Sequence, residues 1–565
     1  MRGQKFAIYL LIAALAVVAT AACGGESAGP PGGINDADAG GDYQPPTDDG
    51  DQGEPQPPQP EVPETYRYSQ PAIVGDKVYV ANETLDAVAI IDSRSLEIQA
   101  APVGRAPTQV VAPVDGAGDE ARVMVLNEGD HTVSLIDPDG GESLHVPVLR
   151  HANRLQATAS GRFGVAWYDS SEAGPAGDLS AITVVSSAGS FDVAVGFLVR
   201  QVLFDEVGER ALVVSDDGVS VLDLAAIESD RFVAPRPLTP PGFEAVDPNE
   251  LRLLLGPRGD TLVAWTPSEP FLFVSDLSED ARVAIALGAP PTGAALSDAT
   301  LVLALREANR LLAITLPEGL EAARADQEAR GLWVDGAFVP PLAEEAFVDS
   351  EGFVYLSLEV PGLGSVVLSD DASVAMAFTT NPQEQRGVLV DMASQELSPV
   401  RFEKEVRGVL ADETGQTFLV IHPRRPGSRQ GLTPADPEFV ERSHAFSVLD
   451  IDSTQTRLVL TELAIARAVL FAPEAGDAFV YLSYENPETG QAELVAHREI
   501  VRVNLGSFRS EVLRLSALPD AMGLIPGTGR VYVNQVHPQG RITFVEAATG
   551  ERQTVTGYQL NSGIF

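Results

Sequence analysis

The sequence predicts an all-β protein, a β-propeller, and two observations carry this prediction. Short runs of aliphatic and β-branched residues recur between residues 66 and 565, and the Asp or Glu residues that close them return about every 40–60 residues. The strands are apolar on both faces, as in residues 88–91, which suits blades packed between two neighbours. A period of about 40–50 residues with four short strands per unit is typical of propeller blades.

The repeat is clearest in the first two units and the last. In the first unit, Lys77–Asn82 and Ala87–Asp92 are apolar runs separated by a polar turn, and residues 122–127 and 132–137 repeat them. Copies further along are residues 211–215 with 219–223, 417–421 with 446–450, and 530–534 with 541–546. Asp side chains at turns accept hydrogen bonds from nearby amides, so we expect a structural role for the closing carboxylates. These are Asp92, Asp137, Asp223, Asp276, Asp391, Asp450 and Glu546.

Residues 77–107 resemble the YVTN family of β-propeller repeats. Val78-Tyr79-Val80-Ala81-Asn82 carries the family's name motif, with Ala81 where threonine is usual, and residues 103–107 carry its Val-Gly-x-x-Pro turn. The match is good for the first two units and the last, and loose between Ala152 and Asp520. The resemblance implies a propeller in an extracytoplasmic setting. It implies no activity, because one fold hosts many functions.

About ten candidate units lie between Tyr66 and Phe565, whereas propellers usually have roughly four to eight blades. We therefore expect seven or eight blades, some of the units being insertions. A larger ring and two smaller rings are the alternatives. One expected insertion is residues 317–330, whose Glu- and Ala-rich composition predicts a short helix. The other is residues 423–442, a loop with Pro and Arg residues inside a blade.

The N-terminus has the order of a secretory signal. Arg2 and Lys5 precede an apolar run at residues 6–18, and small residues follow up to Ala22. This run is shorter than the roughly 20 residues needed to span a bilayer. We predict a signal peptide at residues 1–22.

Cys23 is the only cysteine of the chain. Thr20-Ala21-Ala22-Cys23 resembles the bacterial lipobox, with Thr20 where leucine is usual, and this implies that Cys23 carries a lipid that attaches the protein to a membrane. Cleavage after Ala21 or Ala22, leaving a free thiol, is the alternative. Gly24 follows, where aspartate often signals retention in the inner membrane, so we expect the outer membrane of a bacterial cell envelope.

Residues 23–64 differ from the rest in composition. They are rich in Gly, Pro, Gln and Asp and contain no Lys or Arg, so they offer too little apolar surface to fold. We predict a disordered acidic tether, with a calcium-binding patch as the alternative, followed by a propeller domain at residues 65–565.

Charge and cysteine content exclude several classes of protein. The chain has 38 basic and 80 acidic residues, a net charge of −42, which argues against nucleic acid as a partner because phosphates need Lys and Arg. A single cysteine excludes disulfides, CxxCH haem attachment, cysteine zinc sites and iron–sulfur clusters. We expect no cofactor.

No catalytic constellation is present in the sequence. There is no GxSxG elbow, HExxH motif, P-loop or EF-hand loop. The seven histidines are scattered, and His145 and His151, which flank a turn, come nearest to a pair. We predict no catalytic residue and no metal site.

Two groups of residues are candidate binding residues. Equivalent turns of the first two units carry amide and acid side chains that suit a cation or a basic partner, and one loop carries a basic cluster that suits a carboxylate or phosphate. The first group is Asn82, Glu83, Asp86, Asn127, Glu128 and Asp130, and the second is Arg424, Arg425 and Arg429. Solvated turns and loops are the alternative interpretation.

These observations favour a monomeric binding or scaffold module for a protein or other ligand rather than an enzyme. A hydrolase of the lactonase type is the alternative, since some lactonases share related repeats; it would need His, Arg and Glu side chains converging at one face. An electron-transfer role is a third possibility, but the absence of CxxCH excludes covalent attachment of a haem. We expect the binding surface on one face of the disc, in the longer loops at residues 169–180, 235–248 and 423–443.

Overall fold

The structure is a computed structural model that describes residues 66–114, 120–138, 143–173, 179–205, 209–230, 233–238, 250–277, 281–334, 337–341, 351–412, 414–461, 464–483 and 498–558. All of them belong to the second of two units of the chain, Thr65–Phe565. The predicted signal peptide, Cys23 and the tether at residues 23–64 lie outside the described residues.

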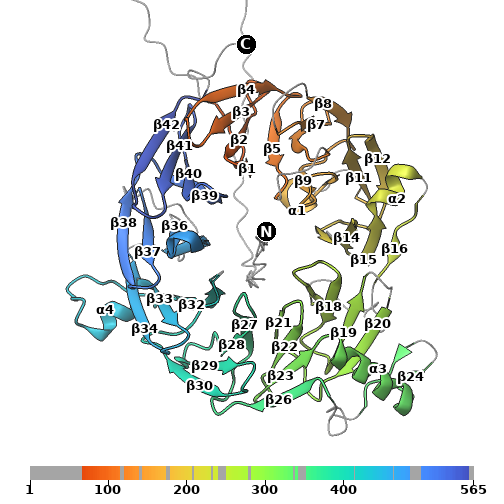
Figure 1. Ribbon diagram of the computed structural model, residues 1–565, viewed down its shortest axis with the longest axis vertical. Helices are drawn as coiled ribbons and strands as arrows, with labels where there is room; N and C mark the ends of the chain where they lie inside the picture. Colours follow the sequence, from red (N-terminus) through yellow and green to blue (C-terminus); the bar gives the residue numbers. More distant parts are fainter. Residues whose placement is uncertain are drawn as a thin grey trace, which may run out of the picture. The chain divides into compact units, whose positions relative to one another are not determined.

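The described residues form ten antiparallel four-stranded sheets that follow one another around a ring (Figure 1). Blades 1 to 5 are β1 (Ala72–Val74), β2 (Lys77–Asn82), β3 (Ala87–Asp92), β4 (Ile98–Pro102); β5 (Pro107–Val111), β6 (Val123–Asn127), β7 (Thr132–Ile136), β8 (Leu144–Pro147); β9 (Arg154–Ala157), β10 (Gly164–Trp167), β11 (Ala181–Ser186), β12 (Gly189–Ala194); β13 (Gln201–Asp205), β14 (Arg210–Ser215), β15 (Gly218–Asp223), β16 (Arg236–Pro237); and β17 (Arg252–Leu255), β18 (Thr261–Trp265), β19 (Phe271–Asp276), β20 (Ala281–Ala286).

Blades 6 to 10 continue in the same order. They are β21 (Gly293–Leu296), β22 (Thr300–Leu305), β23 (Arg310–Thr315), β26 (Phe353–Ser357); β27 (Ser365–Leu368), β28 (Val374–Phe378), β29 (Arg386–Asp391), β30 (Leu397–Arg401); β31 (Gly408–Ala411), β32 (Thr417–His422), β33 (His444–Asp450), β34 (Thr456–Thr461); β35 (Ala464–Ala472), β36 (Asp477–Ser483), β37 (Glu499–Asn504), β38 (Arg509–Arg514); and β39 (Pro519–Ile525), β40 (Arg530–Gln535), β41 (Arg541–Glu546), β42 (Arg552–Thr556). Short helices α1 (Ser170–Ala173), α2 (Leu224–Ser229), α3 (Glu318–Arg330) and α4 (Pro437–Glu441), and the two-stranded pair β24 (Trp333–Val334) with β25 (Ala337–Phe338), lie between strands.

The β-propeller prediction is therefore confirmed, but the preferred number of seven or eight blades was wrong. The structure has ten blades, because the expected insertions lie inside blades instead of replacing them. The helix predicted at residues 317–330 is α3, between the third and fourth strands of blade 6. The loop at residues 423–442 joins the second and third strands of blade 8 and contains α4.

Apolar side chains on both faces of the strands explain how the ring holds together. In blade 1, Val88 and Ile90 pack toward Val125 of blade 2, whereas Ala89 and Ile91 pack toward blade 10. A separate buried cluster lies at each of the ten junctions between consecutive blades. Burial of apolar area at these junctions drives the assembly of the ring.

The ring closes without a shared sheet. Blade 1 consists entirely of N-terminal strands and blade 10 entirely of C-terminal ones. The two ends meet through side chains and through a backbone hydrogen bond from the N–H of Tyr66 to the carbonyl of Pro538 (2.8 Å). The rings of Tyr68 and Tyr558 are 5.1 Å apart in an edge-to-face contact, and Ile542 and Phe544 pack against Val78 in one buried cluster. Gln70 also donates to Asp520 across this junction (3.0 Å).

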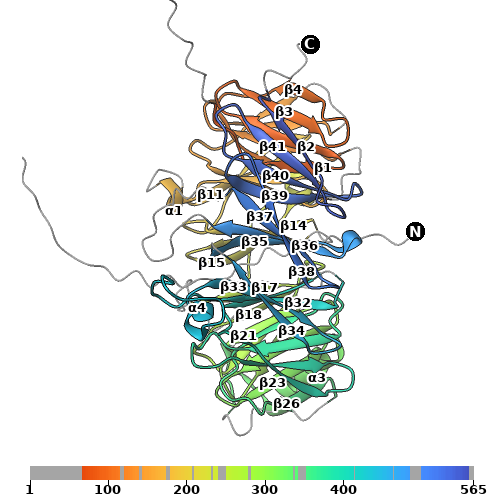
Figure 2. The same cartoon turned by 90° about the vertical axis from the view of Figure 1, so that its left-hand side faces the viewer.

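Because consecutive strands are antiparallel, the connections alternate between two faces of the ring. We call link face the side with each blade's second-to-third-strand turn and the link to the next blade, and turn face the opposite side. Helices α1 and α4 project from the link face and α3 from the turn face (Figure 2). The loops at residues 169–180 and 423–443 leave and rejoin their sheets at the link face, and the chain leaves blade 4 at residue 238 and enters blade 5 at residues 250–251 on the same face.

Four of the closing carboxylates have the expected structural role, whereas Glu546 pairs with Arg530 (3.4 Å). Asp92 Oδ1 accepts the backbone N–H groups of Arg94 (2.8 Å) and Ser95 (2.7 Å). Asp391, Asp450 and Asp223 accept amides two or three residues further on in the same way. Each carboxylate satisfies amides of a turn-face connection that would otherwise lack an acceptor.

Among the described residues, no helix is long and apolar enough to span a bilayer.

Candidate functional site

The turns of blades 1 and 2 that were predicted from the sequence lie side by side on the link face. Their aspartates accept hydrogen bonds from the chain segment that links the two blades. The N–H of Ala106 donates to Asp86 Oδ1 (2.8 Å) from one side, and the N–H of Arg105 donates to Asp130 Oδ2 (3.0 Å) from the other. A Cβ atom on Gly104 would lie 2.6 Å from Asn127 Nδ2, so only glycine fits at this position of the link.

The amide side chains of these turns are also engaged. Asn82 Oδ1 accepts the N–H groups of Thr84 (3.0 Å) and Leu85 (3.2 Å). Asn127 Nδ2 donates to Ser134 Oγ (2.8 Å) and Thr132 Oγ1 (3.0 Å). Both amides therefore hold the geometry of their own turn.

The two glutamates of the group are more exposed than the two asparagines. Glu83 pairs with Arg67 (3.4 Å), and Glu128 accepts from the hydroxyl of Thr108 (2.8 Å). Within the part of the chain that the structure describes, no three His, Cys, Asp or Glu side chains are placed to hold a metal ion. A binding role for these turns stays a prediction.

The ring of His151 contacts that of His131, whereas His145, the histidine nearest to it in the sequence, contacts Ser134. His151 lies against His131, with ring centroids 6.4 Å apart, and against Tyr168 (6.5 Å). His145, on β8, instead contacts Ser134 Oγ through Nδ1 (2.9 Å).

The basic cluster of blade 8 is part of a network of ion pairs and hydrogen bonds on the link face. Arg425 pairs with Glu405 (2.5 Å) on the link from blade 7 and with Glu441 (2.8 Å) at the end of α4. The guanidinium of Arg429 lies 5.3 Å from the centroid of Phe439, a cation–π contact. Arg424 donates to the carbonyl of Gly427 (3.2 Å).

A fully buried lysine fixes this loop to the ring. Lys404 Nζ donates to the carbonyls of Val440 (2.7 Å), Glu441 (2.9 Å) and Ser443 (3.1 Å). These carbonyls lie at the C-terminal end of α4, where a cation is favourable. Burial lowers the pKa of Lys404 to about 8 because it penalises the charged form.

His422 completes the support beneath the loop. Its Nδ1 donates to the carbonyl of Glu405 (2.7 Å), so its Nε2 accepts the hydroxyl hydrogen of Ser447 (2.7 Å). Burial lowers the pKa of His422 to about 4, and the imidazole is neutral. The Ser447–His422 pair has the atoms of a nucleophile and its base, but both side chains are buried between strands, so we assign no reaction to it.

The pKa of His444 reflects the positive charge around it. Desolvation and the nearby cations Arg424, Arg429, Lys404 and Arg407, in that order, lower its pKa to about 4. The cations come from two segments, the link from blade 7 and the loop at residues 423–443. Such a concentration of positive charge is unusual in a chain with a net charge of −42.

The sequence pattern drew attention to Arg424, Arg425 and Arg429 but not to Lys404, Glu405, His422 or His444. A usable signal was present in Glu403-Lys404-Glu405-Val406-Arg407, a charged stretch directly before an innermost strand. In the equivalent link of blade 2 the sequence is Val103-Gly104-Arg105-Ala106. Charges before a buried strand indicate a partner elsewhere in the fold.

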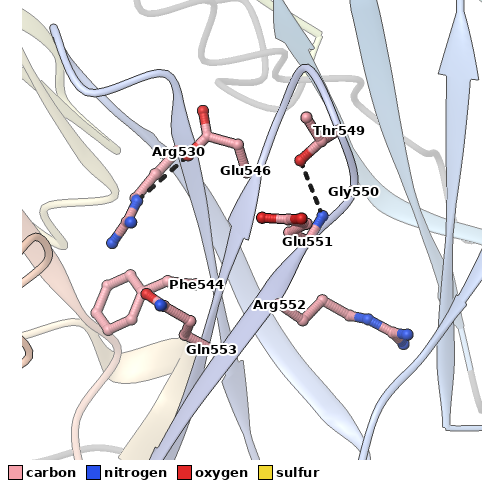
Figure 3. Close-up of a pocket in the computed structure, with 8 residues that line it drawn as sticks. All are labelled: Arg530, Phe544, Glu546, Thr549, Gly550, Glu551, Arg552 and Gln553. Atoms are coloured by element: carbon pink, nitrogen blue, oxygen red, sulfur yellow. Dashed lines mark hydrogen bonds and ion pairs between the residues drawn. The ribbon is translucent and has the colours of Figure 1, made fainter.

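A pocket of about 490 Å³ lies on blade 10 and is lined by Arg530, Phe544, Glu546, Thr549, Gly550, Glu551, Arg552 and Gln553 (Figure 3). Arg530 already pairs with Glu546 (3.4 Å) and donates to the carbonyl of Ser93 in blade 1. Arg552 points away from the Phe544 ring and donates to the carbonyl of Arg514 in blade 9. These arginines join blades, and we assign no ligand to the pocket.

The fold and site define a ten-bladed β-propeller with a basic, anchored loop on its link face. No protein-family model matches the sequence, and no curated protein matches it.

Three solved structures illustrate the likeness of fold. Crystal structures of Citrobacter koseri AztD (15% identity, 69% of this chain and 94% of that one, TM-score 0.35) and of the eukaryotic initiation factor (7%, 87% and 98%, TM-score 0.43) are similar to it. Kuenenia stuttgartiensis hydrazine synthase is similar over 62% of this chain and 99% of that one (16%, TM-score 0.27). At these identities we take no function from them.

Proposed function

We propose that this protein is a lipid-anchored, extracytoplasmic binding module of the YVTN propeller type, which captures a partner on its link face. Cys23 carries the anchor in this proposal, residues 23–64 are the tether, and the outer membrane is the location. The partner is a protein or another ligand, and the propeller acts as a monomer.

The observation that carries the proposal is the anchoring of the loop at residues 423–443. A surface loop does not need a buried lysine to fold. Taking a lysine out of water costs several kcal/mol, and the hydrogen bonds that the lysine gains in the fold only about offset this cost. Lys404, Glu405 and His422 together hold the loop in one conformation. A loop ordered in advance loses less entropy when it binds, which is the advantage expected of a recognition surface.

The position of the loop supports the same conclusion. The ends of the loop at residues 169–180 and the link from blade 4 to blade 5 lie on the same face as the anchored loop. Blade flanks are buried at every junction between blades, so the loops are the surface that remains available to vary. The described ends of the connections between β10 and β11, between blades 4 and 5, and between β32 and β33 therefore lie on one face.

The test compares capture of a partner by two variants of the full chain. Replacing residues 424–441 with a short Gly-Ser turn should abolish capture of a reproducible partner from solubilised membranes. The control variant Arg258→Gln/Arg324→Gln/Arg509→Gln removes charges from the turn face only and should capture as wild type does. Equal capture by the loop variant, with an unchanged thermal melt, would refute the proposal.

The anchor has its own test. Cys23→Ser should release the protein into the soluble extracytoplasmic fraction or leave it unprocessed, since a serine cannot take the thioether-linked lipid. A variant that is still processed and still sediments with membranes would show that another element holds the protein there.

A further inference from the structure

The link-face turn of blade 2 carries a histidine at a position that other blades use for a structural contact. His131 is the residue directly before the third strand and has a φ of 57°, close to the φ of Asp86 in blade 1 (51°) and of Asn309 in blade 6 (50°). In those two blades the side chain accepts a backbone N–H of the following link, that of Ala106 (2.8 Å) and that of Gly362 (3.0 Å). Blade 2 has an imidazole there instead.

A second histidine lies at the matching position of the link from blade 2 to blade 3. The N–H of Val148 donates to the carbonyl of His131 (2.9 Å), as the equivalent link amide of blade 1 does to its own turn (3.0 Å). Three residues further on, the two links reach His151 and Ala106, which both have a positive φ (74° and 49°). The two imidazoles therefore meet where blade 1 has its carboxylate–amide hydrogen bond, with ring centroids 6.4 Å apart.

Both imidazoles are available to a ligand. Besides their contact with each other and that of His151 with the buried ring of Tyr168 (6.5 Å), neither ring has a partner in the described part of the chain. His151 is exposed and His131 is half-buried. The neighbouring Asp130 is engaged, because it accepts the hydroxyl of Thr132 (2.7 Å) and a link amide (3.0 Å). The ring nitrogens are therefore what this pair offers to a ligand.

A pair of imidazoles suits a particular class of metal ion. Imidazole nitrogens are typical ligands of the late first-row transition metals, whereas Ca²⁺ and Mg²⁺ prefer oxygen. An ion bound to an imidazole nitrogen at about 2.1 Å lies roughly 3.2 Å from the centre of the ring, so two rings with centroids 6.4 Å apart can hold one ion between them. The net charge of −42 raises the concentration of cations near the protein surface.

We propose that His131 and His151 bind one divalent transition-metal ion, Cu²⁺ in preference to Ni²⁺ and Zn²⁺. Affinity for nitrogen ligands is highest at Cu²⁺ in this series. No third His, Cys, Asp or Glu of the described residues is placed to join the pair, so water completes the coordination and the ion is exchangeable, unlike one in a closed structural site. The inference goes beyond the proposed function, because this site lies between blades 2 and 3 and not in blade 8.

Isothermal titration calorimetry tests the site on the full chain in detergent, without a histidine tag and after treatment with a chelator. CuCl₂ should show one saturable site for which MgCl₂ does not compete. His131→Asn and His151→Gln should each lower its affinity for Cu²⁺ by about tenfold or more, because each removes one of two protein ligands. His131→Asn supplies the amide that blade 6 has at this position, so the turn is preserved. His145→Gln, the matched control in the same blade, should bind Cu²⁺ as wild type does.

A second measurement needs no variant. With one equivalent of Cu²⁺ bound to the wild-type protein, pulsed electron paramagnetic resonance should show coupling to the nitrogens of two imidazoles, and the melting temperature should rise with the Cu²⁺ concentration. Equal affinity in wild type and in His131→Asn/His151→Gln, or a bound Cu²⁺ with oxygen ligands alone, would overturn the inference. Neither result bears on partner capture by the loop of blade 8, which is measured separately.

Discussion

Blade 1 and blade 8 solve the same problem, holding the link-face connections, by different means. Blade 1 uses short side chains: Asp86 accepts one amide of the link, and Gly104 leaves room for Asn127 and Asp130. Blade 8 uses long charged side chains that reach across the blade and are buried there, Lys404 above all. The difference shows that a regular junction needs only local backbone contacts, whereas an inserted loop needs support from a distant segment.

The regular solution recurs at the link from blade 3 to blade 4. At the start of blade 4 the N–H of Phe197 donates to Asp217 Oδ2 (2.7 Å), and a Cβ on Gly196 would lie 2.1 Å from Ser215 Oγ. This glycine and carboxylate repeat the positions of Gly104 and Asp130. The links that lead into blades 2 and 4 contain no buried lysine equivalent to Lys404.

The largest expected difference between the two blades lies in their lysines. Lys404→Ala should lower the free energy of unfolding by about 3 kcal/mol, because it leaves a cavity and three carbonyls without their donor. Lys77→Ala in blade 1 removes a single bond to the carbonyl of Pro138 (2.9 Å) and should cost about 1 kcal/mol. Urea unfolding measures both; equal losses would mean that the blade 8 support is dispensable.

Acid should weaken blade 8 through His422. Its pKa is about 4 in the folded protein and near 6.5 when unfolded, so between pH 6.5 and 4 the unfolded chain takes up a proton that the folded one refuses. Stability is therefore lost as the pH falls through this window, by up to about 3 kcal/mol. His444 contributes in the same direction. Unfolding of His422→Gln should show a shallower pH dependence than wild type over pH 4–6.5, and the same slope would contradict the assignment.

Crowding in the link of blade 1 should be felt next. Gly104→Ala places a methyl group 2.6 Å from Asn127 Nδ2 and 2.8 Å from Asp130 Oδ2, and the shifted side chains lose hydrogen bonds. We expect a loss of about 2 kcal/mol. Gly506→Ala is the matched control, because nothing lies within 4 Å of the added Cβ. A thermal melt that is unchanged in Gly104→Ala would show that the link can shift to make room for the added methyl group.

The smallest effect concerns the turn face. Asp92→Ala removes the acceptor of two turn amides and should cost about 1 kcal/mol. These bonds and Lys77 lower the pKa of Asp92 although burial opposes them, so its stabilising effect is present above the ordinary pKa and is lost as the pH falls through the lowered one. Asp92→Asn, which keeps an oxygen acceptor, should recover part of the loss in urea unfolding.

Repetition explains which parts of the fold could be predicted. The strand order, the turn carboxylates such as Asp92 and the helix at residues 318–330 follow from local patterns. The blade number was wrong because the usual range of roughly four to eight blades outweighed the ten or so units that the sequence itself shows. In blade 6 the third strand, β23, ends at Thr315 without a closing carboxylate, so the closing motif is not required for a unit to be a blade.

The site of blade 8 depends on contacts that no local pattern contains. Lys404 finds its acceptors 36 to 39 residues further along the chain, and without that contact a Glu-Lys-Glu sequence is typical of exposed surface. The arginines of the loop were recognisable because basic residues are rare in this chain. Their supports were not, since burial of a charge is decided by the tertiary fold alone.

The ring closes without a shared sheet, and each sheet is made from one stretch of the chain, which has a topological consequence. The described ends of the propeller meet where Tyr68 contacts Tyr558, and no sheet would lose a strand if the ends were joined there and the chain opened at another link. A circular permutant with new termini at residues 289–291, between blades 5 and 6, keeps every strand pairing of the natural order. In this ring, the point at which the polypeptide starts is a matter of gene order and not of architecture.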